Sequence, residues 1–132
     1  MIYGSGVDIT SIPEFLSAWR EPGTAFFKKY YTEGELDYCR SRGEKQIGGH
    51  LAARYAAKEA FVKALDGQRL FQPAAIQVDY RDIEVKNDDY GRPFLKIHNE
   101  LWKYVEKEGV SRILLSLSHV EDYAIAQVIL ET

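Results

Sequence analysis

Cysteine is nearly absent from this sequence: Cys39 is the only one among 132 residues. A single thiol excludes an internal disulfide framework and a cysteine-ligated metal site, and it fits a reducing, cytoplasmic compartment. No feature of the neighbouring sequence predicts an activated thiol, so we expect Cys39 to be packed in the interior.

Long apolar runs and an excess of positive charge are lacking as well. No apolar stretch approaches the roughly 18 residues of a membrane-spanning helix, and no basic-then-apolar leader opens the sequence, so we expect neither membrane insertion nor secretion. Lys and Arg number 17 against 20 Asp and Glu, a formal net charge of −3. That balance disfavours a general nucleic-acid binder, which needs a basic face. The length suffices for one hydrophobic core, so residues 1–132 are predicted to form a single domain.

What the sequence does contain is a strong helical stretch at residues 51–65, LAARYAAKEAFVKAL. It holds six alanines and neither glycine nor proline, so helix propensity is high throughout. With about 100° per residue, one arc roughly 100° wide carries no charge. This arc consists of Ala53, Ala57, Ala60, Phe61 and Ala64. Small side chains let another element approach closely, so the pattern predicts a buried central helix.

The charges of this helix are Arg54, Lys58, Glu59 and Lys63, which form two pairs at i,i+4 spacing. Glu59 has apolar neighbours on both sides, and a carboxylate in such surroundings is unusual unless a cation meets it. Taken alone, the helix favours an ordinary Glu59–Lys63 ion pair, worth about 0.2–0.5 kcal/mol. A functional carboxylate is the alternative.

The N-terminal part predicts one strand followed by helices. Residues 1–10 contain strand formers and two glycines that permit close backbone approach. Asp8 interrupts this pattern and, taken alone, is more typical of a turn or a helix cap than of a metal ligand. Ser11 and Glu14 predict a capping box that opens a helix ending at Glu21-Pro22-Gly23. Further helical patterns follow at residues 26–31, at 32–40 behind a Thr32/Glu35 capping box, and after a polar connection at 41–49.

In the C-terminal part the hydrophobic period changes from 3.6 to 2. The alternation predicts strands at 76–80 and 83–85, a turn at 87–93 and a return strand at 94–97. A helix is predicted at 99–108, with Leu101, Trp102 and Val105 inward. The last two strands, 113–118 and 123–130, are predicted to form a hairpin joined by 119–122. The fold class is therefore α+β, with a mostly antiparallel sheet wrapped on the buried central helix.

Charged residues from three separate elements form a candidate site. Asp8 and Glu59, if brought together, make an oxygen-ligand site suited to Mg²⁺, which takes one or two carboxylates plus phosphate oxygens. Lys63 offers a point charge to a phosphate, and Arg54 and His119 are further phosphate donors. Such a set suits transfer of a phosphoryl-linked group from a metal-bound pyrophosphate, although spacing alone does not show that these residues meet.

Four segments together resemble holo-[acyl-carrier-protein] synthase, the small, single-domain 4′-phosphopantetheinyl transferases. They are GVDI (6–9), YTEGELDYC (31–39), RYAAKEAFVKAL (54–65) and SLSHVEDYAIAQVI (116–129). The resemblance implies an enzyme that moves 4′-phosphopantetheine from coenzyme A to a serine of an apo acyl carrier protein, as in fatty acid biosynthesis, releasing adenosine 3′,5′-bisphosphate. It further implies a homotrimer with sites between subunits, so that His119 of one chain faces Asp8 and Glu59 of the next.

The resemblance also assigns roles to residues. Asp8 and Glu59 would hold Mg²⁺ on the coenzyme A pyrophosphate, and Lys63 would stabilise charge on the phosphate oxygens. The acceptor serine would lose its proton to Asp8, to Glu59 or to a metal-bound water, and the sequence does not choose among them. The residues implied for the adenosine end and its 3′-phosphate are Arg54, Ser118, His119 and, by its basic character, Lys45.

Three departures from the family pattern bear on function. Asp66-Gly67-Gln68 stands where the family has Gly-Thr-Gly, which adds a negative charge near the expected phosphate site. Val120 lacks the hydroxyl of the usual threonine, and the first helix has Arg20 as its only basic residue. These differences leave open a non-catalytic coenzyme A or nucleotide-binding protein of the same fold. A structural oligomerisation domain with a plain Glu59–Lys63 ion pair is a third hypothesis.

Overall fold

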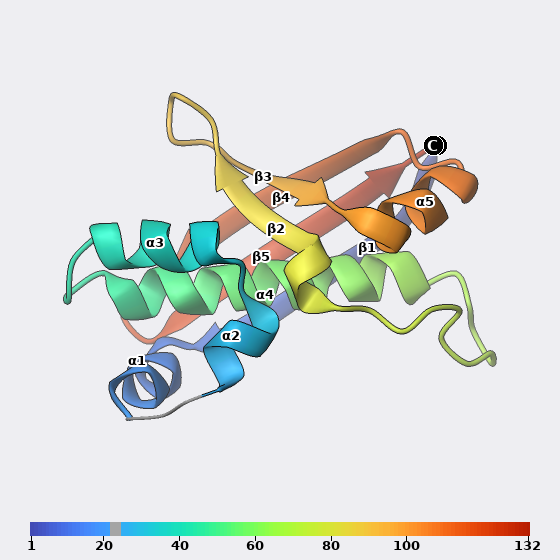
Figure 1. The fold of residues 1–132 in the computed structure, drawn as a ribbon. Coiled ribbons are helices and arrows are strands. Elements are labelled where there is room, and N and C mark those ends of the chain that lie inside the picture. The colour runs from blue at the N-terminus through green and yellow to red at the C-terminus, as the bar shows by residue number, and fades with distance from the viewer. Residues whose placement is uncertain (22–24) are drawn as a thin grey trace.

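The computed structural model describes residues 1–21 and 25–132, and a long central helix, α4, crosses the molecule against a three-stranded sheet (Figure 1). The elements are β1 (Ile2–Ser11), α1 (Ile12–Arg20), α2 (Phe26–Tyr30), α3 (Glu33–Ser41), α4 (Ile47–Asp66), the 3₁₀ turn η1 (Tyr80–Asp82), β2 (Ile83–Asn87), β3 (Pro93–Ile97), α5 (Asn99–Lys107), β4 (Arg112–His119) and β5 (Tyr123–Glu131). The larger sheet has the order β1-β5-β4, β2 and β3 form a separate hairpin, and all pairing is antiparallel. The predicted α+β class is confirmed.

The central helix is buried because β1 lies directly on it. A Cβ atom at Gly4 or Gly6 would overlap the carbonyl oxygen of Ala64 or Ala60, so only glycine permits this approach. All five residues of the predicted uncharged arc are buried. Asp8 lies two residues beyond Gly6, on the face of β1 that meets α4, and pairs with Ala126 of β5. It therefore sits inside a strand, not in the turn or helix cap that is typical of such a residue taken alone.

The central helix begins at Ile47, where the sequence predicted a polar connection through residue 49. Gly48 explains the difference, because a Cβ atom there would come within 3.0 Å of the Leu16 Cβ in α1. This glycine is therefore a packing residue at a helix crossing, and it does not mark a break. The early start adds another turn to α4, and that turn carries His50.

The predicted helix starts are confirmed where capping is local. The Ser11 hydroxyl accepts a hydrogen bond from the Glu14 N–H at 3.3 Å, and Thr32 and Glu35 form a complete capping box. Pro22 and Gly23 of the predicted stop lie outside the described residues. Among the described residues, no helix is long and apolar enough to cross a membrane.

Two predictions in the C-terminal part are wrong. Residues 76–80 form no strand, because no strand lies beside them in the described part of the chain to supply hydrogen-bond partners. Instead the Asp79 carboxylate accepts from the Arg81 N–H at 3.0 Å and starts η1. Trp102 was expected inward with its neighbours Leu101 and Val105, but it is 42% exposed while those two are buried.

Candidate active site

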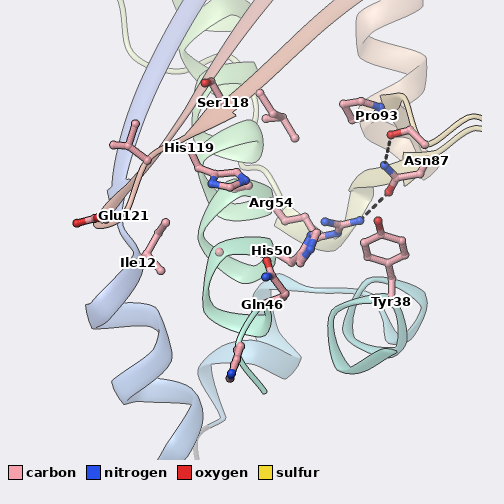
Figure 2. Close-up of a pocket in the computed structure, with 16 residues that line it drawn as sticks. Ile12, Tyr38, Gln46, His50, Arg54, Asn87, Pro93, Ser118, His119 and Glu121 are labelled. Carbon is pink, nitrogen blue, oxygen red and sulfur yellow. Dashed lines mark hydrogen bonds between the residues drawn. The ribbon is translucent and has the colours of Figure 1, made fainter. Parts of the chain in front are cut away.

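A cavity of about 630 Å³ opens beside the N-terminal half of α4, between the β4–β5 turn and the β2–β3 hairpin (Figure 2). Its lining includes the residues predicted for the adenosine end, namely Lys45, Arg54, Ser118 and His119. Four residues from three segments of the sequence thus line one cavity within a single chain.

Arg54 is the most constrained side chain of this cavity. The residue is only 3% exposed, its terminal Nη2 donates to the Asn87 Oδ1 at 2.9 Å, and its guanidinium carbon lies 4.3 Å from the centre of the Tyr38 ring. Its Nε is buried and has no hydrogen-bond partner among the described residues. An unpaired buried donor costs about 1–3 kcal/mol, and the guanidinium places a fixed positive charge in the wall of the cavity.

His50 also lines the cavity and was missed from the sequence. It lies one helical turn before Arg54, and its ring meets Tyr38 edge-on at a centroid distance of 5.4 Å. Burial, with the nearby charges of Arg54 and Arg42, lowers the pKa of His50 to about 4. The imidazole is therefore neutral at pH 7 and hydrogen-bonds without carrying charge. The only available signal was the i,i+4 spacing to Arg54, which becomes visible once α4 is known to start at Ile47.

Asp8 and Lys63 contact each other across the β1–α4 packing. The Lys63 Nζ donates to the Asp8 Oδ1 and to the Val7 carbonyl oxygen, each at 3.1 Å, and the Thr10 hydroxyl donates to the Asp8 Oδ2 at 3.0 Å. The structure gives Lys63 this partner in place of the expected Glu59. The Lys63 side chain is 54% exposed and the Asp8 side chain 17%, so the lysine is free to exchange its partner.

Glu59 faces a second cavity, of about 370 Å³, whose lining includes Tyr30, Tyr55 and Tyr80. Burial, followed by the nearby Glu59 carboxylate, raises the pKa of both Tyr55 and Tyr80. The charge of Asp8 adds to the effect on Tyr55. Glu59 thus lies beside the three-tyrosine wall of this cavity, while Asp8 lies on the β1 side of α4 in contact with Lys63.

Lys58 belongs to neither cavity, although the helix pattern placed it in a pair with Arg54. Its side chain is fully buried, and its Nζ donates to the Glu35 Oε1 at 2.8 Å, to the Tyr80 carbonyl at 2.9 Å and to the Ile83 carbonyl at 2.6 Å. All three ammonium donors are used. This lysine therefore ties α3, η1 and the start of β2 to α4.

The two sets of site residues lie on different sides of α4. Arg54 and Glu59 are five residues apart, which is about 140° around a helix. Among the described residues, the lining of the larger cavity contains none of Asp8, Glu59 and Lys63. Within a single chain the two sets of residues therefore lie in separate places.

The donor set on the Asp8 side fits Mg²⁺. In residues 1–21 and 25–132 no group of three or more His, Cys, Asp or Glu side chains could hold a metal by itself. Two carboxylates are nevertheless the protein share that Mg²⁺ takes when phosphate oxygens and water complete its shell. The Lys63 ammonium on the Asp8 Oδ1 occupies the place that a cation would take.

The unusual segment Asp66-Gly67-Gln68 ends α4 far from the larger cavity of the same chain. Asp66 follows Arg54 by twelve residues, or about 18 Å along the helix. The Gln68 amide donates to the Tyr3 carbonyl of β1. The added negative charge therefore does not face Arg54 within the chain. Val120, by contrast, lines that cavity and is exposed.

The sequence matches a family model described as the 4′-phosphopantetheinyl transferase superfamily over residues 4–128. The chain belongs to this superfamily. It is 39% identical over 131 residues to the holo-[acyl-carrier-protein] synthase of Geobacter sp. (strain M21), covering 99% of both chains. The resemblance drawn from the four sequence segments is thereby confirmed.

Solved structures of the same family share the fold. The Chronobacterium ammoniagenes ACPS-CoA complex superimposes with a TM-score of 0.84 at 33% identity, covering 97% of this chain and 96% of the other. The holo-(acyl-carrier-protein) synthase of Bacillus anthracis in complex with CoA (3′,5′-ADP) gives 0.76 at 31% identity, covering 100% and 98%. This member of the superfamily therefore has the fold of relatives that were solved with coenzyme A.

Proposed function

We propose that the chain transfers 4′-phosphopantetheine from coenzyme A to a serine hydroxyl of an apo acyl carrier protein and releases adenosine 3′,5′-bisphosphate. Full-length relatives that bear the synthase name support this activity. The structural observation that carries it is the cavity that the Arg54 guanidinium lines together with Ser118 and His119. Phosphate oxygens are the acceptors that a buried guanidinium prefers.

The adenosine end of coenzyme A is assigned to the larger cavity. Arg54 supplies a fixed positive charge to the 3′-phosphate, since Asn87 and Tyr38 already hold its guanidinium. His119 and Lys45 line the same cavity and add donors. Ser118 contributes a hydroxyl that can donate or accept.

The reacting end is assigned to the β1–α4 side, where Asp8 and Glu59 would hold Mg²⁺. The cation, when bound, supplies charge stabilisation to the pyrophosphate oxygens. Lys63 exchanges Asp8 for a phosphate oxygen and donates to it as negative charge develops. The acceptor serine must lose a proton, and the Asp8 and Glu59 carboxylates are the candidate bases on this chain.

A complete site then needs a second copy of the chain, and we propose a homotrimer with sites between subunits. The outward face of the β1-β5-β4 sheet carries exposed apolar side chains that another copy would cover. They are Val7, Ile9, Leu114 and Ile125. In this assembly His119 of one chain faces Asp8 and Glu59 of the next.

Mixed trimers test this arrangement. His119→Ala and Glu59→Gln chains are each expected to be inactive alone. On co-expression, about one site in four combines an intact Glu59 with an intact His119 from the neighbour, so about a quarter of wild-type activity returns. Sites contained within one chain would regain nothing. Sedimentation of the wild-type protein measures the oligomeric state independently.

Intact-mass analysis tests the reaction itself. Apo carrier proteins of fatty acid and polyketide synthesis are incubated with coenzyme A, Mg²⁺ and the protein. A mass gain of one phosphopantetheine unit identifies both reaction and partner, and Glu59→Gln serves as the inactive control. A cytoplasmic location fits the free thiol of Cys39.

A second candidate function is coenzyme A or nucleotide binding without transfer. The exposed Val120 in the cavity wall and the Asp66-Gly67-Gln68 segment favour it. Its signature is calorimetric binding of coenzyme A with no mass gain on any apo carrier.

A further inference from the structure

The Asn87 side chain joins the β2–β3 hairpin to the central helix at the wall of the larger cavity (Figure 2). Its Oδ1 accepts a hydrogen bond from the Arg54 Nη2 at 2.9 Å, and its Nδ2 donates to the Gly91 carbonyl oxygen at 3.1 Å. A guanidinium offers only donors and a carbonyl oxygen only accepts, so both partners require the same orientation of the amide. The amide oxygen of Asn87 is therefore directed at Arg54.

Two contacts of the Arg54 guanidinium restrict different motions. Its central carbon lies over the Tyr38 ring, 4.3 Å from the ring centre. The face of a flat ring opposes tilting of the guanidinium, but it does not stop the group from turning within its own plane. The hydrogen bond from Nη2 to Asn87 sets that remaining angle. It uses one of the five N–H donors of the group and determines which of the others point into the cavity.

The turn that carries Asn87 is braced without help from Arg54. The Asp88 Oδ1 accepts from the N–H groups of Tyr90 and Arg92, each at 2.8 Å. The Asp88 N–H donates to the Arg92 carbonyl oxygen at 2.9 Å. The turn is thus a fixed support, and Asn87 is the side chain through which it holds the guanidinium.

We infer that Asn87 is a positioning residue, which acts through Arg54 and makes the cavity select coenzyme A over its 3′-dephospho form. The inference rests on the proposed function, in which Arg54 receives the 3′-phosphate. A charge attracts a phosphate from any direction, whereas paired N–H···O bonds require the planar guanidinium to face the phosphate oxygens. Without Asn87 the charge stays in the cavity wall but its direction is no longer fixed, so the 3′-phosphate should contribute less to binding.

Asn87→Ala removes the oxygen that Arg54 contacts. Isothermal titration calorimetry measures the binding of coenzyme A and of 3′-dephospho-coenzyme A to the wild type and to the variant. We expect the affinity for coenzyme A to fall about tenfold, the lower end of what a charge-assisted hydrogen bond contributes. The affinity for the 3′-dephospho form should hardly change. Asp88→Ala is the matched control, because it removes the other side chain that braces the same turn and leaves the contact with Arg54. Its preference for coenzyme A should match the wild type.

A second pair of variants separates positioning from direct contact, because Asn87 itself lines the cavity. Arg54→Lys replaces the planar guanidinium by an ammonium that has no plane to orient. If Asn87 acts through Arg54, adding Asn87→Ala to Arg54→Lys should cost little further affinity for coenzyme A. The same further loss as in the wild-type background would show that Asn87 touches the ligand itself, which overturns the inference.

Other outcomes of the calorimetry overturn it as well. Equal losses for both ligands in Asn87→Ala, or the same loss in Asp88→Ala, would mean that the turn maintains the shape of the whole cavity. Unchanged or tighter binding of coenzyme A would mean that Asn87 competes with the phosphate for Arg54. A wild type that binds both ligands equally well also contradicts the inference. A wild type that prefers coenzyme A but modifies no apo carrier overturns the proposed transfer instead and leaves the role of Asn87 standing.

Discussion

Lys58 and Lys63 are five residues apart on α4, and they differ in burial and in how many of their donors are used. The Lys58 side chain is fully buried and uses all its donors, whereas that of Lys63 is 54% exposed and holds Asp8 at 3.1 Å. Burial lowers the pKa of Lys58, and Glu35 opposes that shift. Lys58 therefore stabilises the fold, whereas Lys63 can exchange Asp8 for another partner. The same residue type is structural on one side of α4 and available for chemistry on another.

Removing the buried lysine is expected to give the largest effect. Lys58→Met leaves the Glu35 carboxylate buried without its cation, and breaking such a pair costs about 3–5 kcal/mol. Urea denaturation measures the loss. A double variant, Lys58→Met with Glu35→Leu, should recover part of it because no unpaired charge remains. Equal stability of single variant and wild type would remove the contrast between the two lysines.

On the other side of the helix the expected loss is in activity. Glu59→Gln should lower transfer by about 10²–10³-fold, the range seen when a charge-stabilising group is deleted, with urea stability close to wild type. The readout is mass gain on an apo carrier per unit time. Glu106→Gln makes the same chemical change on an exposed position of α5 and should leave the rate unchanged. Undiminished turnover of Glu59→Gln would rule out its role.

Local signals made much of the fold predictable. The uncharged arc of the central helix, the Ser11 cap and the Thr32/Glu35 capping box each depend on residues within a few turns of one another, and each is confirmed. The strand predicted at residues 76–80 is wrong for the converse reason. Its side chains alternate, but a strand also needs a partner, and partners are not encoded in the alternation.

The candidate site was predictable only in part. Asp8, Arg54, Glu59, Lys63 and His119 were proposed because their residue types suit a phosphate and a metal, and Ser118 was implied by the family resemblance alone. The pairing of Lys58 with Glu35, 23 residues away, is set by how α3 packs on α4, which helical spacing cannot reveal. His50 was missed because Gly48 resembled a helix break until the contact with Leu16 explained it.

Lys63→Met provides the direct counterpart to the Lys58 variant. An exposed ion pair contributes about 0–1 kcal/mol, so the free energy of unfolding should hardly change. Transfer should fall about 10–100-fold, because a charge-assisted hydrogen bond to a phosphate is worth about 1.5–3 kcal/mol. Urea melts and transfer rates on the same samples check both halves. A stability loss as large as that of Lys58→Met would show that the two positions do not differ in kind.

The smallest expected effect concerns His50 and the pH dependence of stability. Its pKa is about 4 in the folded chain and 6.5 when unperturbed, so the unfolded state takes up a proton first as pH falls. Its contribution to stability is therefore complete above pH 6.5 and is lost progressively toward pH 4. Because the ring is only half-buried, the loss is a small part of total stability.

Urea melts of wild type and His50→Gln between pH 7 and 4 measure the loss of stability that is due to His50. The glutamine variant lacks the imidazole, while all other titrating groups remain. Parallel pH profiles for the two proteins would mean that His50 is as easily protonated folded as unfolded, and that the cavity around Arg54 holds its imidazole less tightly than the packing on Tyr38 implies.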